Sequence, residues 1–129
     1  MIAASLRLVV PAKHRTEVLR TLRSLVGPTS AQAGCASCGI YRDALDDGIY
    51  LYVEEWGSRE QLERHIRSDL YRRLLAVMEI AVEQPEVRYD TISERQGFEL
   101  VEAIRSPVGV RPASGRLTKR TAKKKKSER

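Results

Sequence analysis

Residues 53–75 read VEEWGSREQLERHIRSDLYRRLL, and this stretch decides the fold. The run that leads into Trp56 is rich in β-branched and aromatic residues and then stops at a glycine, which predicts the end of a strand. Its two faces carry Ile49, Leu51 and Val53 on one side and Tyr50, Tyr52, Glu54 and Trp56 on the other. Ser58 is followed three residues later by Gln61, the spacing of a capping box. Ser68 is a second serine with the preferences of an N-cap. We therefore predict a strand, a short helix that begins after Ser58, and a second helix that begins after Ser68.

The chain before this stretch supplies three strands and one helix. Apolar residues at every second position indicate strands, and a spacing of three to four indicates a helix. An Asp-Gly pair between two of the strands is a hairpin signal, and Gly27 with Pro28 predicts the helix end. The strands are expected over residues 2–10, 36–43 and 48–56, and the helix over residues 12–26.

After this stretch the helix begun at Ser68 is predicted to close at Pro85. A fourth strand follows over residues 86–94, and residues 98–101 are interpreted as a short fifth strand. The order β-α-β-β-α(α)-β predicts an α+β protein of the ferredoxin-like class, an antiparallel sheet with helices on one face. Because the opposite face still carries apolar side chains, we expect a second subunit to cover it in a homodimer.

The net charge of +6 belongs to the end of the chain. Residues 106–129 hold nine Lys or Arg and one acid, whereas residues 1–105 hold 14 basic and 16 acidic residues. We predict one folded domain over residues 1–105 and a disordered basic tail over residues 106–129. A near-neutral body argues against specific nucleic-acid binding, and the tail is expected to contact anionic partners only non-specifically.

Neither a membrane span nor an export signal is evident. No apolar run reaches the roughly 18 residues that a transmembrane helix needs. The first residues, MIAASLR, lack the charged region and long apolar run of a signal peptide. We expect no membrane insertion and a cytoplasmic location.

Cys35 and Cys38 form a C-x-x-C motif that leads into a predicted strand. Positions three apart in a regular strand face opposite sides, which makes a disulfide or a shared metal ligand geometrically poor. A zinc site needs about four ligands, and no second cysteine pair exists. We interpret the motif as two small buried thiols and expect no metal site.

Three segments carry a resemblance to a known family: GCASCGIYRD at residues 34–43, VEEWGS at 53–58 and HIRSDLY at 65–71. They resemble the antibiotic biosynthesis monooxygenase domain, and the similarity extends over about residues 2–95. The typical pattern is a strand that ends in an acid and a tryptophan, then a helix that starts at a serine, then a His-x-x-Ser step into the next helix. The resemblance implies a dimeric α/β barrel in which two ferredoxin-like sheets pack face to face. It also implies oxygenation of aromatic polyketides or quinols without metal, flavin or any other cofactor.

Some relatives in this family bind and degrade haem, and two positions argue against that chemistry here. Leu75 stands where those relatives carry the histidine that ligates iron. His65 stands where they tend to carry a tryptophan.

His65 is the candidate catalytic residue, because histidine most readily exchanges a proton near neutral pH. The alternative is a structural histidine that bonds a carbonyl or caps the step between two helices. The candidate substrate-binding residues are Trp56, Tyr50, Tyr52, Tyr71 and Arg7. Their alternatives are a core or interface anchor for the tryptophan, and packing against a partner sheet for the two strand tyrosines.

Glu54 and Glu55 are interpreted as one surface charge and one salt-bridge partner across the dimer, although either could act as a base. Three functions stay open from the sequence. The first is a cofactor-independent monooxygenase for a phenolic or quinol-type aromatic substrate. The second is a non-catalytic dimeric small-molecule-binding or scaffold protein, and the third makes the basic tail functional. A cavity that touches His65 would favour the enzyme, and a solid core would favour the scaffold.

Overall fold

The computed structural model describes residues 1–106, and the predicted basic tail therefore lies almost entirely outside the described residues. Two compact units are distinguished, one of residues 1–93 and one that begins at Glu94. The first unit contains β1 (Ile2–Val9), a 3-10 turn η1 (Ala12–His14), α1 (Arg15–Ser30), β2 (Cys35–Arg42), β3 (Ile49–Trp56), α2 (Arg59–Ile66), α3 (Asp69–Met78) and β4 (Glu86–Thr91). The second unit contains α4 (Glu99–Arg105).

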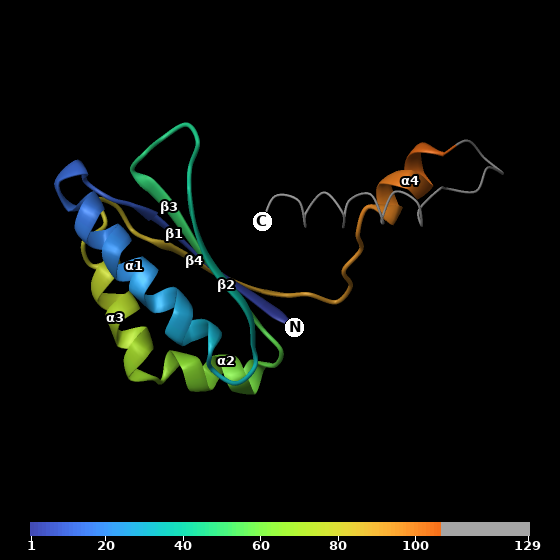
Figure 1. The fold of residues 1–129 in the computed structure, drawn as a ribbon, viewed down its shortest axis with the longest axis horizontal. Helices are drawn as coiled ribbons and strands as arrows, with labels where there is room; N and C mark the ends of the chain where they lie inside the picture. The colour runs from blue at the N-terminus through green and yellow to red at the C-terminus, as the bar shows by residue number, and fades with distance from the viewer. Residues whose placement is uncertain (107–129) are drawn as a thin grey trace. The chain divides into compact units, whose positions relative to one another are not determined.

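The sheet is antiparallel, with the strand order β2-β3-β1-β4 (Figure 1). All three helices of the first unit lie on one face of this sheet. The predicted ferredoxin-like α+β arrangement is thus confirmed. None of the helices in residues 1–106 is both long and apolar enough to cross a bilayer.

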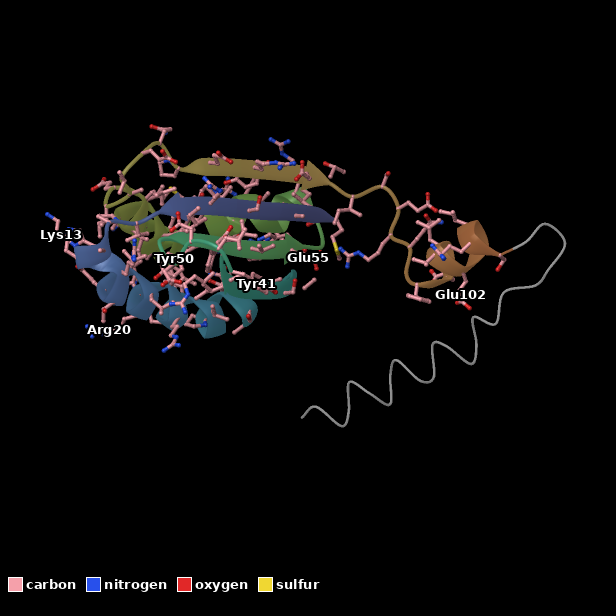
Figure 2. All side chains as sticks on the ribbon, turned by 90° about the horizontal axis from the view of Figure 1, so that it is seen from above. Lys13, Arg20, Tyr41, Tyr50, Glu55 and Glu102 are labelled. Atoms are coloured by element: carbon pink, nitrogen blue, oxygen red, sulfur yellow. The ribbon has the colours of Figure 1, made fainter. Side chains whose placement is uncertain are left out.

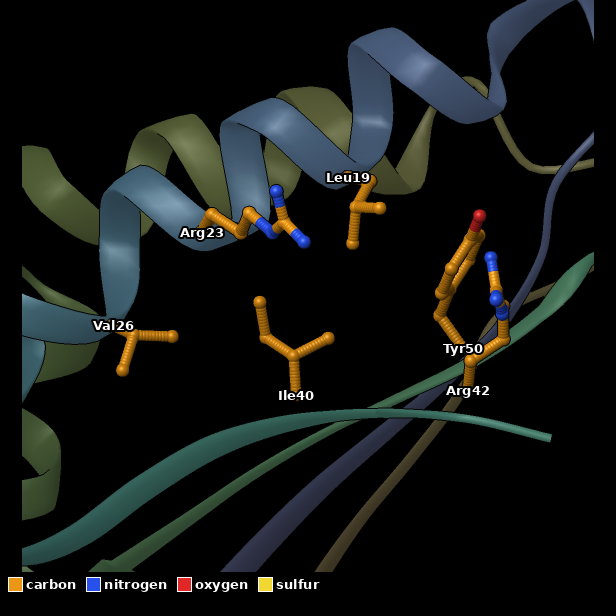
Figure 3. A pocket seen from close by; sticks show the side chains of 6 residues that line it. All are labelled: Leu19, Arg23, Val26, Ile40, Arg42 and Tyr50. Carbon is orange, nitrogen blue, oxygen red and sulfur yellow. The ribbon is translucent and has the colours of Figure 1, made fainter. Parts of the chain in front are cut away.

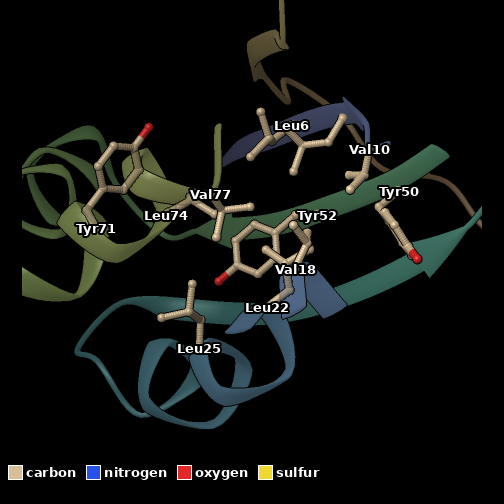
Figure 4. Close-up of a cluster of buried hydrophobic side chains, with 11 residues drawn as sticks. Leu6, Val10, Val18, Leu22, Leu25, Tyr50, Tyr52, Tyr71, Leu74 and Val77 are labelled. Atoms are coloured by element: carbon tan, nitrogen blue, oxygen red, sulfur yellow. The ribbon is translucent and has the colours of Figure 1, made fainter. Parts of the chain in front are cut away.

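The core lies between this face and the helices (Figure 4). Alternate residues of β3 face the helices, and Tyr50, Tyr52 and Trp56 are each at most 2% exposed. From the other side α1 contributes Val18, Leu22 and Leu25, spaced three to four residues apart. Burying one such aliphatic side chain contributes about 1.5–3 kcal/mol, so this interface accounts for much of the folding free energy.

Both predicted serine caps are present. The Ser58 hydroxyl accepts the backbone N–H of Gln61, and the Ser68 hydroxyl accepts that of Tyr71. Ser68 also donates to the His65 carbonyl at 2.6 Å. Ser68 thus links the start of α3 to the His65 carbonyl in the last turn of α2.

Two predicted helix ends are wrong. The helix α1 continues past Gly27 and Pro28 to Ser30, because proline removes only one hydrogen bond and the last turn is held by buried Thr29. The helix α3 ends at Met78, well before Pro85. Two tight turns follow Met78, and the Val82 N–H then bonds to the Val9 carbonyl at the end of β1.

The predicted fifth strand at residues 98–101 is also wrong, since this segment opens α4. Its apolar residues Leu100, Val101 and Ile104 are spaced as helical neighbours. The alternation seen in the sequence was too short to distinguish the two periods.

The arrangement of the two cysteines differs from the prediction. A bulge between Cys35 and Ser37 shifts the register, so that Cys35 lies opposite Trp56 and Cys38 opposite Glu54. Because Trp56 and Glu54 share the helix-facing side of β3, both thiols lie on that same side rather than on opposite ones. They are free and half-buried rather than fully buried.

Candidate functional site

A buried polar cluster lies where α2 meets the end of β3. The ring of His65, in the last turn of α2, stacks on Trp56 with centroids 4.7 Å apart. Its Nε2 lies 2.9 Å from Glu54 Oε2, and the Trp56 indole N–H donates to Glu54 Oε1 at 3.0 Å. Glu54 and His65 are each 3% exposed. The strand period places Glu54 beside Trp56, and the capped helix places His65 above both.

Each oxygen of the Glu54 carboxylate faces one of these two donors. A carboxylate only accepts hydrogen bonds, so His65 Nε2 carries the proton and donates it. A buried carboxylate without donors would be costly, and here each oxygen has one. The interpretation of Glu54 as a surface charge or a dimer salt-bridge partner is therefore wrong. Its neighbour Glu55 accepts the Ser37 hydroxyl on the outer side of the sheet.

The other ring nitrogen of His65 faces a loop. His65 Nδ1 lies 2.5 Å from Gln32 Oε1, in the turn between α1 and β2. Gly34 follows in that turn with a φ of +88°, a conformation that glycine adopts without strain. An amide oxygen only accepts hydrogen bonds, so with Gln32 placed in this way Nδ1 is a donor, and it can accept a proton only when this amide turns or moves away.

Access to the Glu54–His65 pair is narrow. The cavity beside Glu54, here called the narrow cavity, measures only about 10 Å³, and Tyr52, Tyr71, Leu74 and Tyr89 are among its lining residues. Tyr71 and Tyr89 join their hydroxyls across it at 3.1 Å, and burial raises the pKa of Tyr71. His65 lines neither this cavity nor three wider ones at the surface of the described residues, of about 510, 260 and 260 Å³.

Two of the candidate substrate-binding residues join His65. Trp56 stacks on its ring, and Tyr71 meets it edge-on with centroids 5.4 Å apart. Tyr52 points to the helix side, but its hydroxyl donates to Thr29 and accepts the Cys38 thiol. Burial raises the pKa of Tyr52, and it raises that of Cys38 to about 11, so both groups stay uncharged at neutral pH.

The remaining two candidates lie elsewhere. Arg7 pairs with Glu86 at 3.8 Å and Glu83 at 4.0 Å on the half-exposed outer side of the sheet. Tyr50 lines the wide cavity of about 510 Å³ between α1 and β2, together with Leu19, Arg23, Val26, Ile40 and Arg42 (Figure 3). The two tyrosines of β3 thus pack under the helices, and not against a partner sheet.

The sequence analysis did not place Gln32 or Tyr89 at the site, and it did not predict that Glu54 is buried. The signal for Glu54 was available, because it alternates with Tyr52 and Trp56 and so shares their face. Gln32 stands in a loop and Tyr89 in an edge strand, and no pattern marks either. Within residues 1–106, no three His, Cys, Asp or Glu side chains are gathered closely enough to hold a metal ion.

Comparison with known proteins gives one family and a set of similar folds. The model of the family described as "Antibiotic biosynthesis monooxygenase" matches residues 1–77, more than half of the chain. A search of curated proteins gives no match.

The fold is similar to that of several solved structures. Rv0793 from Mycobacterium tuberculosis is 25% identical with a TM-score of 0.68, over 74% of this chain and 98% of that one. A Deinococcus radiodurans protein provisionally named an antibiotic biosynthesis monooxygenase is 17% identical with a TM-score of 0.69, over 75% and 97%. PA3566 from Pseudomonas aeruginosa is 22% identical with a TM-score of 0.64, over 72% and 94%. At these identities the structures establish the shared fold.

Proposed function

The chain belongs to the antibiotic biosynthesis monooxygenase family, and from this premise we propose that it oxygenates a phenolic or quinol-type aromatic substrate without metal or flavin. A deprotonated quinol is electron-rich enough to pass an electron to O₂ directly. The protein then has to supply a proton acceptor and a site that excludes water. In the overall reaction a quinol and O₂ give a hydroxyquinone and water. One oxygen atom enters the ring, the other leaves as water, and the substrate supplies all four electrons.

The observation that carries this proposal is the buried Glu54–His65 pair stacked on Trp56. Glu54 holds the ring through Nε2. Nδ1 is the nitrogen that can receive a proton once Gln32 Oε1, which only accepts hydrogen bonds, no longer faces it. For this, a substrate hydroxyl replaces the Gln32 amide at Nδ1 after the loop moves aside. The proton then resides on a ring whose charge is balanced by the adjacent carboxylate.

The test is oxygen consumption by the full chain with a panel of quinols and naphthoquinols under ¹⁸O₂. We expect turnover above the buffer rate, one ¹⁸O atom per product molecule by mass spectrometry, and no dependence on added chelator. Peroxide formation without label in the organic product would contradict oxygenation. A rate equal to that of heat-denatured protein with every quinol would contradict catalysis on this substrate class.

A second candidate is a non-catalytic binding protein of the same fold. The burial of Glu54 and His65 favours it, because each residue is only 3% exposed. The narrow cavity of about 10 Å³ also has no room for an aromatic ring. This alternative predicts saturable binding of a small aromatic molecule that is recovered unchanged. The same ¹⁸O₂ experiment therefore distinguishes the two.

We further propose that two copies pair through the outer face of the sheet, as the family resemblance implies. That face carries Tyr41 at 60% and Leu51 at 38% exposure, which a second sheet would cover. We expect sedimentation of a dimer at micromolar concentration and a monomer after Leu51→Glu. The control Leu45→Glu changes a residue that is 97% exposed in the β2–β3 turn and should leave the dimer intact. A monomeric wild-type protein would contradict this pairing.

A further inference from the structure

The wide cavity is lined by residues that take no part in the Glu54–His65 cluster. The core stripe of α1 runs through Val18, Leu22 and Leu25, and the neighbouring stripe, one residue further on, is Leu19, Arg23 and Val26. Because β2 is an edge strand, this second stripe faces the sheet margin instead of the core. There it leaves the cavity of about 510 Å³, a size typical of small-molecule sites.

Two positive charges border this cavity from opposite walls. Arg23 extends from α1 over Ile40, while Arg42 rises from β2 (Figure 3). Neither guanidinium has an ion pair or hydrogen bond with another described residue, unlike Arg7, Arg59 and Arg88, which all have carboxylate partners. No acidic side chain lines the cavity. The nearby hairpin aspartates Asp43 and Asp46 accept backbone N–H groups of their own turn instead. The cavity is therefore a concave surface with two uncompensated cations.

The Tyr50 hydroxyl adds a neutral hydrogen-bonding group to this cavity. Tyr50 is 2% exposed and lies opposite Arg42 in the β2–β3 ladder. Its hydroxyl makes no hydrogen bond to any described residue, and it is not among the buried polar atoms without a partner, so the hydroxyl oxygen reaches solvent at the cavity. Since Tyr50 lines the cavity, this hydroxyl is free to donate a hydrogen bond to a molecule bound there.

We propose that the wide cavity binds an aromatic ring that carries an oxyanion, a carboxylate or a phosphate monoester. The ring lies among Leu19, Val26 and Ile40, and the anion accepts hydrogen bonds from Arg23, Arg42 and the Tyr50 hydroxyl. Guanidinium groups match the planar, two-oxygen geometry of such anions. The site is built by α1, β2 and the start of β3, whereas His65 lies over the end of β3. Binding there does not rest on the proposed oxygenation.

The experiment is calorimetric titration of the full-length protein with three probes: 2-naphthoate, 2-naphthyl phosphate and the neutral 2-naphthalenemethanol. We expect saturable binding of one or both anions, at least ten-fold tighter than the neutral alcohol. The tighter anion identifies the group. Arg23→Gln and Arg42→Gln should each weaken that probe about ten-fold or more, and Tyr50→Phe about three- to ten-fold.

Arg20→Gln is the matched control, since Arg20 projects from the outer side of α1 (Figure 2) and does not line the cavity. It should leave affinity unchanged, and so should His65→Gln. Equal affinity for the alcohol and the anions, or no saturable binding of any probe, would overturn the proposal. So would unchanged binding in both arginine variants while thermal melting shows them folded. Loss of turnover with quinols would not affect these outcomes, so failure of the two proposals can be told apart.

Discussion

His65→Gln is expected to lower the rate of quinol-dependent oxygen consumption about 10²- to 10⁴-fold, the range typical of a lost acid–base group. Glutamine can still hydrogen-bond to Glu54 but cannot take up a proton. The effect should therefore fall on kcat, with KM changed little. Steady-state oxygen electrode measurements at several pH values would separate the two constants.

The matched control is His14→Gln. His14 lies in η1 at the surface, where its Nδ1 contacts Glu17 at 3.4 Å, and it takes no part in the cluster. It should retain full activity. Thermal melting has to show that His65→Gln stays folded, since the ring is buried against Trp56 and Tyr71. A folded His65→Gln protein with wild-type kcat would remove His65 from the mechanism and leave it a structural residue.

Trp56→Ala is expected to lower the free energy of unfolding by about 3–5 kcal/mol, the usual cost of truncating a large buried aromatic side chain. Trp56 is fully buried, and its loss leaves a cavity beneath the His65 ring. It also removes the N–H that donates to Glu54 Oε1, and an unsatisfied buried acceptor adds about 1–3 kcal/mol. Since a domain is typically stable by about 5–15 kcal/mol, this variant is expected to be close to unfolding at 37 °C.

Urea denaturation followed by circular dichroism measures the effect. Trp56→Phe separates its two parts, because it fills much of the cavity but cannot donate to Glu54, and it should lie between the wild type and the alanine variant. Leu45→Ala, at a residue 97% exposed, should stay within about 0.5 kcal/mol of the wild type. A loss below about 1 kcal/mol for Trp56→Ala would mean that the cluster is not a structural anchor.

The fold was accessible from the sequence because its elements are patterned locally. The alternation along β3, the stripe of α1 and the caps Ser58 and Ser68 each act within a few residues. The errors came where tertiary contacts override local preference. Buried Thr29 carries α1 through Pro28, and a bulge in β2 brings Cys35 and Cys38 to one side. Neither the continuation of α1 nor the bulge in β2 is marked by a pattern in the sequence of its own segment.

The candidate site was only partly predictable for the same reason. His65 and Trp56 were singled out by residue type, and the family resemblance added weight. Glu54 was misassigned because two adjacent acids in a strand look alike until the buried face is known. Gln32 reaches His65 from 33 residues away along the chain, a separation that no local pattern spans.

By itself the sequence determined the order of strands and helices as far as β4, the family, and the fact that Tyr50, Tyr52, Glu54 and Trp56 share one face. These follow from periods of two and 3.6 residues, which act at short range. Only the tertiary structure decided which face the helices cover, and hence that Glu54 is buried against His65. It also decided that Arg23 and Arg42 border one cavity, because these residues come from a helix and an edge strand that are brought together only by the fold.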